Sequence, residues 1–248
     1  VTWAIMSTGV SPRRCAALIL LLLVPAGARV GQSAPGATFQ GLVGAFEAGD
    51  FRRCERLAAQ VDPATTLNPD VLGLVEIEND GYGADSAIQD LVNKLNAVAG
   101  AGTYAFINVD ANTGMPDAMG DDAIRNAIIY QPASVTPVGT TAVLDTVAFV
   151  NGGDSAPRNR VSVLQAFEDN DTTAVFLVNV NHLKSKGSAC DDPDAGDGQG
   201  NCNIVRENAV YELVSWFGTD PTGTADPDIV MLGDLNSYAK EDPIVALE

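Results

Sequence analysis

The sequence has little positive charge and almost no histidine. Its 248 residues include 14 lysines and arginines against 32 acidic residues, a formal net charge of −18, and one histidine, His182. The few lysines form no stripe or patch, and this charge balance argues against tight electrostatic binding to nucleic acid or to an anionic membrane. A nucleic-acid substrate remains compatible with this charge, because a bound divalent metal can supply positive charge where a phosphate sits.

Cysteine is also scarce, with four in the chain. Metal ligation by cysteine is disfavoured, since the sequence has no Cys-x-x-Cys pair and no histidine near a cysteine. Cys15 falls in the N-terminal segment, and the helical spacing of Cys54 with apolar neighbours favours a buried thiol. Cys190 and Cys202 enclose CDDPDAGDGQGNC, a loop with no means of packing, and we predict a disulfide between them in an oxidising compartment.

No apolar run is long enough for a comfortable membrane span. The stretch CAALILLLLV follows the basic SPRR and precedes PAGA, which is the order of a secretory signal cleaved after Ala28. We predict that residues 1–28 are a signal peptide and that the protein is secreted, extracellular or periplasmic, without stable membrane association after cleavage. An uncleaved anchor is the alternative. Residues 29–50 are expected to be a linker or a poorly ordered lead-in.

The rest of the sequence is suited to one folded domain. Hydrophobic residues make up 46% of the chain, enough for a sizeable core, and there is no internal repeat or long low-complexity tract. Helices are expected after a Ser86 cap, with an apolar face through residues 88–95, and at residues 209–217. Several strands follow one another with only turns between them, which favours an α+β sandwich of mixed sheets. Strands are expected at residues 71–76, 103–109, 123–130, 142–150, 160–167, 174–182 and 228–234.

Three of the predicted strands end in polar side chains. A strand fixes its backbone while the terminal side chain reaches a solvent-accessible cleft. Carboxylates, amides and an imidazole are the groups that metal-assisted attack on a phosphodiester requires. Each residue alone is typical of a solvated rim, but together they predict a hydrolytic site. The strand ends are Glu76 followed by Glu78, Asn79 and Asp80; Asn181 with His182; and Asp234 with Asn236.

His182 has two interpretations. A lone histidine is commonly a satisfied structural imidazole under a loop. In NVNHLKSKG, however, His182 ends an apolar strand and is followed by two lysines and a glycine, which brings hydrogen-bond donors and positive charge into a small space. Such a space suits a phosphate oxygen, so the sequence context favours a functional histidine.

Six motifs resemble one known family. GLVEIEND, AIRNAIIY, RVSVLQAF, VNVNHLKSKG, DAGDGQGNCN and IVMLGDLNSYAKEDPI, in this order, resemble the secreted bacterial branch of the endonuclease/exonuclease/phosphatase superfamily, relatives of deoxyribonuclease I. The resemblance runs from about Asp70 to the last residue. It implies that residues 51–248 form a four-layer α/β/β/α sandwich of two mixed sheets, with a metal-dependent active site across the sheet tops.

The resemblance also implies roles for individual residues. Glu76 would be the principal ligand of Mg²⁺ or Mn²⁺, and Asp234 would orient or deprotonate the attacking water and share in metal binding. Asn236 would hold the phosphate or help to bind the metal, and His182 would donate to the scissile phosphate. No role is assigned to two further basic residues, Arg125 and Arg158, which can equally be surface residues. The expected contacts to substrate phosphate are Arg160, Tyr130 and Asn181.

The sequence departs from the family pattern at both ends. Family members open with a strand that ends in a pattern like TFN, whose asparagine contributes to the metal site, where this chain has Phe39 and Gln40. They close with a Ser-Asp-His segment that binds metal and acts as acid or base, whereas this chain ends at Glu248 and has no second histidine. We therefore expect a domain that is incomplete at its C-terminus, and a rate lower by roughly 10²–10⁴-fold without that group.

The function expected from these features is a secreted, divalent-metal-dependent endo- or exonuclease that hydrolyses phosphodiester bonds of DNA, with RNA as a further substrate. The alternatives are a catalytically impaired fragment, or a phosphatase or phosphodiesterase of the same superfamily, whose small substrate would suit the acidic chain. Nucleic acid is expected as the substrate, and no protein partner is inferred.

The acidic loop offers a second position for a metal. Its carboxylates beside glycines would suit Ca²⁺, which prefers oxygen ligands on a flexible backbone. The other interpretation is a solvated loop tethered by the disulfide, which the absence of EF-hand spacing favours. The four carboxylates belong to Asp191, Asp192, Asp194 and Asp197.

Overall fold

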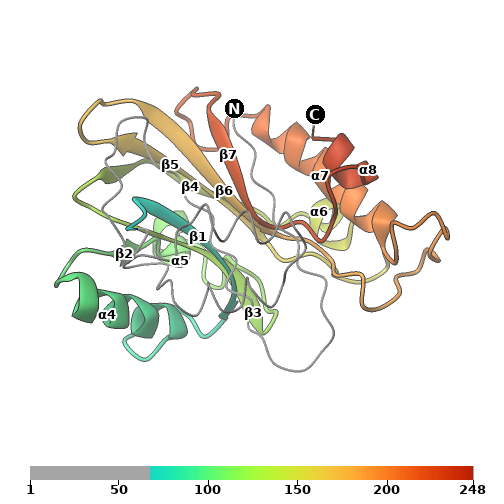
Figure 1. Cartoon of the computed structure of the whole chain (residues 1–248), viewed down its shortest axis with the longest axis horizontal. Coiled ribbons are helices and arrows are strands. Elements are labelled where there is room, and N and C mark those ends of the chain that lie inside the picture. The colour runs from blue at the N-terminus through green and yellow to red at the C-terminus, as the bar shows by residue number, and fades with distance from the viewer. Residues whose placement is uncertain (1–67, 248) are drawn as a thin grey trace, which may run out of the picture.

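The computed structural model describes residues 68–247 (Figure 1). The predicted signal peptide and lead-in, Cys15, Cys54, Phe39 and Gln40 lie outside the described residues. Within residues 68–247 no helix is long and apolar enough to cross a membrane.

The described strands form two sheets. The first has the strand order β1-β3-β2 and antiparallel pairing, and the second has the order β4-β5-β6-β7. Pairing in the second sheet is antiparallel except between β6 and β7, which are parallel and are connected through a helix, as parallel neighbours require. The strands are β1 (Val71–Glu78), β2 (Ala105–Phe106), β3 (Ile124–Tyr130), β4 (Val135–Leu144), β5 (Ser162–Asp169), β6 (Val175–His182) and β7 (Ile229–Asp234).

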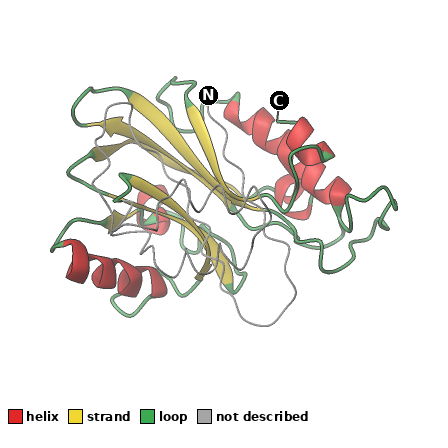
Figure 2. Ribbon diagram, viewed as in Figure 1, coloured by secondary structure: helices red, strands yellow, loops and turns green. Residues whose placement is uncertain are grey.

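Helices cover the outer face of each sheet (Figure 2). On the first sheet, α4 begins after Ser86, whose side chain accepts a hydrogen bond from the Gln89 amide, and it packs through Ile88 and Val92. On the second sheet, α7 packs through its buried face together with α8 and α6. The helices are α4 (Ala87–Ala99), α5 (Val109–Thr113), α6 (Val147–Asn151), α7 (Asn203–Phe217) and α8 (Asp242–Val245).

The two sheets pack face to face around the main core. Alternation along β1 sends Val71 and Val75 toward the second sheet, whereas Leu72 and Leu74 face α4. Gly73 marks how closely the sheets approach, since a Cβ there would lie 2.9 Å from side-chain atoms of both β6 and β7. The order of layers is therefore α4, first sheet, second sheet, α7, and the predicted four-layer α+β sandwich is confirmed.

Most of the predicted elements are present, and two expected strands differ. The strand expected at 142–150 is wrong after Leu144, because the Thr146 side chain accepts from the Phe149 amide and begins α6 there. The strand expected at 103–109 is reduced to β2, because Asn108 caps α5. The first half of β4 was not predicted, since it contains a proline and a glycine. A proline is tolerated there because β4 is an edge strand.

Candidate active site

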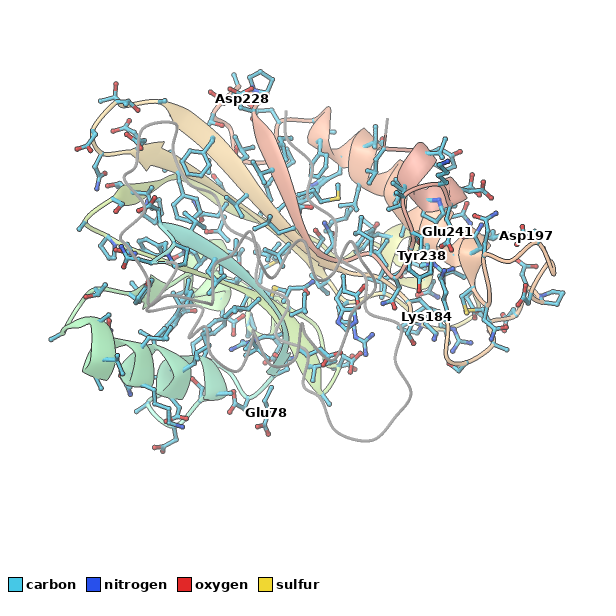
Figure 3. All side chains as sticks on the ribbon, viewed as in Figure 1. Glu78, Lys184, Asp197, Asp228, Tyr238 and Glu241 are labelled. Carbon is cyan, nitrogen blue, oxygen red and sulfur yellow. A yellow bond between two sulfur atoms is a disulfide. The ribbon has the colours of Figure 1, made fainter. Side chains whose placement is uncertain are left out.

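Polar side chains from three strand ends meet at one edge of the sandwich. In the parallel pair of β6 and β7, His182 lies opposite Asp234, and the next amide, Leu183 N, donates to Asp234 O at 2.9 Å. Glu76, near the end of β1 on the facing sheet, is close enough for its charge to raise the pKa of Asp234. We call Glu76, Arg160, His182, Asp234 and Asn236 the strand-end cluster. Figure 3 labels Glu78, the last residue of β1, and Lys184, two residues after β6, both lower in the view than Asp228, which precedes β7.

A β-bulge directs Glu76. Between the pairs Leu74–Ala127 and Ile77–Arg125, β1 has two residues where β3 has one. Leu74 and Ile77 both face α4, so the extra residue places Glu76 on the same side as Val75, toward the second sheet. Glu76 has φ +61°, a conformation that costs a non-glycine residue about 1–3 kcal/mol and is concentrated at functional sites.

Gly233 brings Asp234 against β6. Its φ is +119°, and a Cβ at this position would lie 1.9 Å from the carbonyl oxygen of Asn181. No residue with a side chain fits so close to the neighbouring backbone. The glycine before Asp234 is therefore what allows the carboxylate to lie beside His182.

Asp234 and Asn236 form a tight turn after β7. The Asn236 amide donates to Asp234 Oδ1 at 2.8 Å, and Asn236 itself has φ +48°, which asparagine tolerates better than most residues. The Asn236 Nδ2 donates to Leu183 O at 2.9 Å, which leaves its Oδ1 for a ligand. Burial raises the pKa of the Asp234 carboxyl, and the charge of Glu76 raises it further, so the two carboxylates repel each other.

His182 is a buried, neutral imidazole. It is 4% exposed, and burial lowers its pKa to about 4, with the Arg160 charge lowering it further and Asp122 opposing both. Its Nδ1 is buried without a hydrogen-bond partner among the described residues. The satisfied structural histidine of the first interpretation is therefore not seen, because no hydrogen bond to Nδ1 is present among the described residues.

Arg160 lies beside His182, two residues before the start of β5. Its amide donates to His182 O at 3.2 Å, and its Nε is 3.0 Å from the Asp122 carboxylate. Asn79, at the end of β1, holds the loop that carries Asp122 by donating to Gly120 O at 2.7 Å and to Asp122 O at 3.0 Å. Asp122 was missed from the sequence because DDAIR contains no signal that distinguishes it from a loop carboxylate.

Arg206 fixes the loops around the cluster and was also missed. This fully buried side chain donates from Nε to Ser237 Oγ at 3.1 Å and from Nη1 to the carbonyls of Lys184 and Asn201 at 3.1 and 2.7 Å. It therefore joins the segments after β6 and β7 to the loop before α7, and its charge lowers the pKa of Asp234. In the sequence, Arg206 looks like any arginine at the start of an amphipathic helix.

Tyr130 does not lie in the strand-end cluster. It pairs with Val71, the first residue of β1, so it is about five strand residues, or roughly 16 Å, from Glu76 along the sheet. Its ring packs on Phe167, with centroids 5.5 Å apart, in the core between the sheets. The expected phosphate contact is corrected: β3 runs antiparallel to β1, so its C-terminal residue lies at the opposite edge.

Asn181 faces away from the cluster. Val178 and Val180 point toward the first sheet, so His182 shares that face and Asn181 lies on the face covered by α7. Asn181 is fully buried, and its Nδ2 donates to Asn179 Oδ1. Its expected contact with substrate phosphate is therefore corrected to a structural position, because adjacent strand residues point to opposite faces.

The two unassigned arginines are held by other groups. Arg125 is buried on the α4 side, donates from Nη2 to Gly81 O at 2.6 Å and lies 4.0 Å from the Tyr82 ring centroid. Arg158 pairs with the buried carboxylate of Asp154, Nε to Oδ2 at 3.0 Å, and holds the pKa of Asp154 well below its usual range. Neither arginine belongs to the strand-end cluster.

The donor set of the cluster fits a divalent cation of the Mg²⁺ type. Among the described residues no group of three or more His, Cys, Asp or Glu side chains converges. Mg²⁺ needs fewer protein ligands, since it binds through one or two carboxylates and keeps waters or substrate phosphates as its other ligands. Glu76 and Asp234 supply two carboxylates that repel each other without a cation, and Asn236 supplies an amide oxygen.

The acidic loop does not gather its carboxylates. Asp191 accepts from the Ser155 amide at 2.9 Å, while Asp194 and Asp197 accept from amides two residues ahead, both at 2.9 Å. The loop is exposed, and the predicted disulfide between Cys190 and Cys202 is present. Asp194 and Asp197 thus cap turns of their own loop while Asp191 binds a neighbouring segment, in agreement with the solvated, tethered alternative.

Comparisons with known proteins find similarity only among solved structures. No family model matches the sequence, and no curated protein matches it significantly. The matching structures include the human Nocturnin catalytic domain with bound sulfate: 15% identity over 82% of this chain and 62% of that chain, TM-score 0.46. They also include an endonuclease/exonuclease/phosphatase family protein from Bacteroides thetaiotaomicron: 15% identity over 74% of this chain and 55% of that chain, TM-score 0.47.

A mannosyl-6-phosphatase from the same organism also matches, with 15% identity over 82% of this chain and 64% of that chain, and a TM-score of 0.49. The chain thus spans between 55% and 64% of the length of these three proteins. At such identities the names of these proteins say nothing about the substrate of this chain.

Proposed function

We propose that this chain is a divalent-metal-dependent hydrolase of phosphate esters in the endonuclease/exonuclease/phosphatase superfamily, related to its secreted, deoxyribonuclease I-like branch. The observation that carries the proposal is the strand-end cluster itself. A bulge with positive φ directs Glu76 toward the partly buried Asp234, and a neutral imidazole and an arginine lie beside this pair. Carboxylates, imidazole and arginine are the groups needed to hold a metal and a phosphate and to move a proton.

Each residue of the cluster has a task in this proposal. Glu76, Asp234 and the Asn236 Oδ1 would hold Mg²⁺ or Mn²⁺, which when bound withdraws charge from the phosphate oxygens and favours ionisation of water. Asp234 would orient the attacking water by accepting its hydrogen bond. His182 would make one hydrogen bond to the reacting group as a neutral imidazole, and Arg160 would bind a phosphate oxygen while Asp122 holds its side chain.

For the substrate, we propose a phosphodiester of nucleic acid, DNA first and RNA second. The motif order that resembles the nuclease branch supports this choice. A phosphomonoester of a small molecule is the second candidate, and the net charge of −18 favours it, because a chain this acidic attracts a long polyanion poorly.

We also propose that the protein is secreted. The disulfide between Cys190 and Cys202 supports this, since such bonds persist in oxidising compartments. The signal-like segment at residues 1–28 supports it independently.

Hydrolysis assays with Glu76→Gln test the function. The full chain is incubated with supercoiled plasmid, bis(4-nitrophenyl) phosphate and 4-nitrophenyl phosphate, in Mg²⁺, in Mn²⁺ and in EDTA. We expect hydrolysis that EDTA abolishes, and a loss of at least roughly 100-fold in Glu76→Gln, more than the 10–100-fold typical of a group that only supports a metal ligand.

Glu78→Gln is the matched control for this assay. Glu78 belongs to the same strand and is exposed like Glu76, but it lies beyond the bulge at the tip of β1 (Figure 3). Its substitution should leave the rate unchanged. Equal rates for both variants, or hydrolysis that survives EDTA, would contradict the proposal, and a preference for the monoester would select the second candidate.

A further inference from the structure

Asn126 is a fully buried amide in the apolar strand β3, directly behind the strand-end cluster. Its position opposes the bulge, because the paired residues on either side of the bulge are Ala127 and Arg125. Ile128, two residues on, faces the second sheet, so Asn126 points into the space between the sheets as well. It was not identified from the sequence, although a lone amide within AIRNAIIY is the signal that could have indicated it.

In the Asn126 amide group, the nitrogen is hydrogen-bonded and the oxygen has no partner among the described residues. Its Nδ2 donates to Val161 O, across the gap between the sheets, at 2.9 Å. Its Oδ1 is buried and has no hydrogen-bond partner among the described residues. Because Nδ2 is fixed by a carbonyl, the orientation of the amide is settled and Oδ1 is the atom left to accept.

The imidazole of His182 lies next to this amide. The register of β5 and β6 pairs Val163 with Val180, so Val161 and His182 lie near each other just beyond the last pair of the two strands. The bond from Arg160 N to His182 O keeps the two segments together at this point, with a shift of one residue from the register of the strands. Val161 packs in the core between the sheets, as His182 does by alternation from Val178 and Val180, and Asn126 is hydrogen-bonded to the Val161 carbonyl. The buried, unpartnered Nδ1 of His182 and the buried, unpartnered Oδ1 of Asn126 therefore both lie between the sheets, near Val161.

No other unpartnered buried oxygen in the described residues is suited to this nitrogen. Asn181 lies on the opposite face of β6, Asn203 belongs to α7, and the Tyr82 ring stacks on Phe106 beside α4. The Asp122 carboxylate is half exposed and paired with Arg160. Burying a polar atom without a partner is unfavourable, so Asn126 Oδ1 is the buried oxygen best suited to accept from Nδ1.

We propose that Asn126 is a positioning residue that holds His182 as its Nδ1–H tautomer, by accepting a hydrogen bond from Nδ1 at Oδ1, directly or through one buried water. A neutral imidazole has one N–H, so this assignment makes Nε2 a hydrogen-bond acceptor. The role of His182 in the proposed hydrolysis changes accordingly. Nε2 accepts from the attacking water or from a protonated phosphate oxygen, rather than donating to the scissile phosphate. This consequence rests on the proposed function, whereas the tautomer does not.

The tautomer can be measured without any activity, because His182 is the single histidine of the chain. The full chain is labelled with ¹⁵N-histidine, and long-range ¹H–¹⁵N correlation spectra are recorded at pH 7 in EDTA. The spectrum then contains the ring signals of one imidazole, that of His182. We expect a protonated, pyrrole-type Nδ1 and an unprotonated, pyridine-type Nε2. A wild-type spectrum with the proton on Nε2 overturns the proposal whatever any variant does.

Asn126→Ala and Asn179→Ala form a matched pair of variants. Both asparagines are fully buried, and both donate from Nδ2 to a carbonyl of the β5 segment, at 2.9 Å for Asn126 and 3.0 Å for Asn179. Only Asn126 faces His182. We expect Asn126→Ala to shift the imidazole to the Nε2–H tautomer and Asn179→Ala to leave it as Nδ1–H. Asn126→Asp keeps the acceptor oxygen and should retain the wild-type tautomer.

The outcomes separate this inference from the proposed function. Retention of Nδ1–H in Asn126→Ala would show that another group holds the imidazole and would overturn the role of Asn126. If the chain hydrolyses phosphate esters, we expect Asn126→Ala to lower kcat by roughly 10–100-fold with a smaller change in KM. If the wild-type chain hydrolyses none of them, the proposed function fails, and the spectra still decide the tautomer.

Discussion

At the scale of single residues, the site depends on backbone conformations that few side chains tolerate. Glu76 and Asn236 both have positive φ, and Gly233 lies where a Cβ would overlap the carbonyl of Asn181. These conformations place two carboxylates and an amide oxygen together, and the surrounding packing has to maintain them. The residues nearest the proposed chemistry are thus also the ones with the least freedom to be replaced.

Gly233→Ala should destabilise the fold and abolish the site together. The new Cβ would lie 1.9 Å from Asn181 O, so β7 has to move away from β6 and carry Asp234 with it. We expect a loss of more than about 3 kcal/mol in the free energy of unfolding, measured by urea denaturation. Gly187→Ala is the control, since its Cβ would meet only one atom, the Ser185 Oγ at 4.0 Å. Equal stability of the two variants would contradict this account of Gly233.

His182 should titrate far below an ordinary histidine. Its pKa is lowered to about 4 in the folded chain, chiefly by burial, against about 6.5 when unfolded. The unfolded chain therefore binds more protons between these values, so stability is full above pH 6.5 and falls as the pH drops toward 4, by roughly 3 kcal/mol for this group.

An NMR titration of the single imidazole in EDTA should give a midpoint near pH 4. The variant His182→Gln should lose less stability than the wild type between pH 6.5 and pH 4. A midpoint near 6.5 would mean that the imidazole is solvated and the described burial is wrong.

At the scale of secondary-structure elements, the strand ends carry the site and the following loops hold it. The ends of β6 and β7 meet because the two strands are parallel, and β1 reaches them because the sheets pack face to face. Arg206 on α7 joins the segments that follow β6 and β7 to the loop closed by the disulfide. A displacement of that loop should therefore also displace the segments after β6 and β7, because Arg206 is hydrogen-bonded to all three.

Removal of the disulfide should lower stability in a way that a reductant reproduces. Cys190 and Cys202 are 12 residues apart, and closing a loop of about this length contributes about 3 kcal/mol. We expect the double variant Cys190→Ala, Cys202→Ala to lose about that amount in urea denaturation under oxidising conditions. A reductant should lower the stability of the wild type to that of the variant and leave the variant unchanged. A wild type that is insensitive to reductant would contradict the prediction.

At the scale of the whole molecule, the sequence predicts the sandwich better than the placement of every site residue. The period of apolar residues indicates β1, β3, β5, β6 and β7, and the polar residues after β1, β6 and β7 indicate the edge at which these three strand ends meet. The strand predicted at 142–150 includes α6 because VAFV is as apolar as a strand, and only the Thr146 cap distinguishes it.

The misplaced residues depend on information that a sequence pattern does not contain. Tyr130 was expected at the site, but the direction of β3 puts it at the far edge. Asn181 adjoins His182 in the sequence, and for that reason points to the other face. The bulge that directs Glu76 depends on the register between β1 and β3, as does the position of Asn126 behind it. Register and strand direction arise from tertiary packing rather than from local sequence.

The central claim is that Glu76 and Asp234 together hold one divalent cation, and calorimetric titration with Mn²⁺ tests it most directly. The full chain, Glu76→Gln, Asp234→Asn and the control Glu78→Gln are titrated at pH 7. The account predicts one site in the wild type and in Glu78→Gln, and at least roughly 100-fold weaker binding in the other two variants. Equal Mn²⁺ affinity in all four proteins would contradict it, because the metal would then be bound without the paired carboxylates.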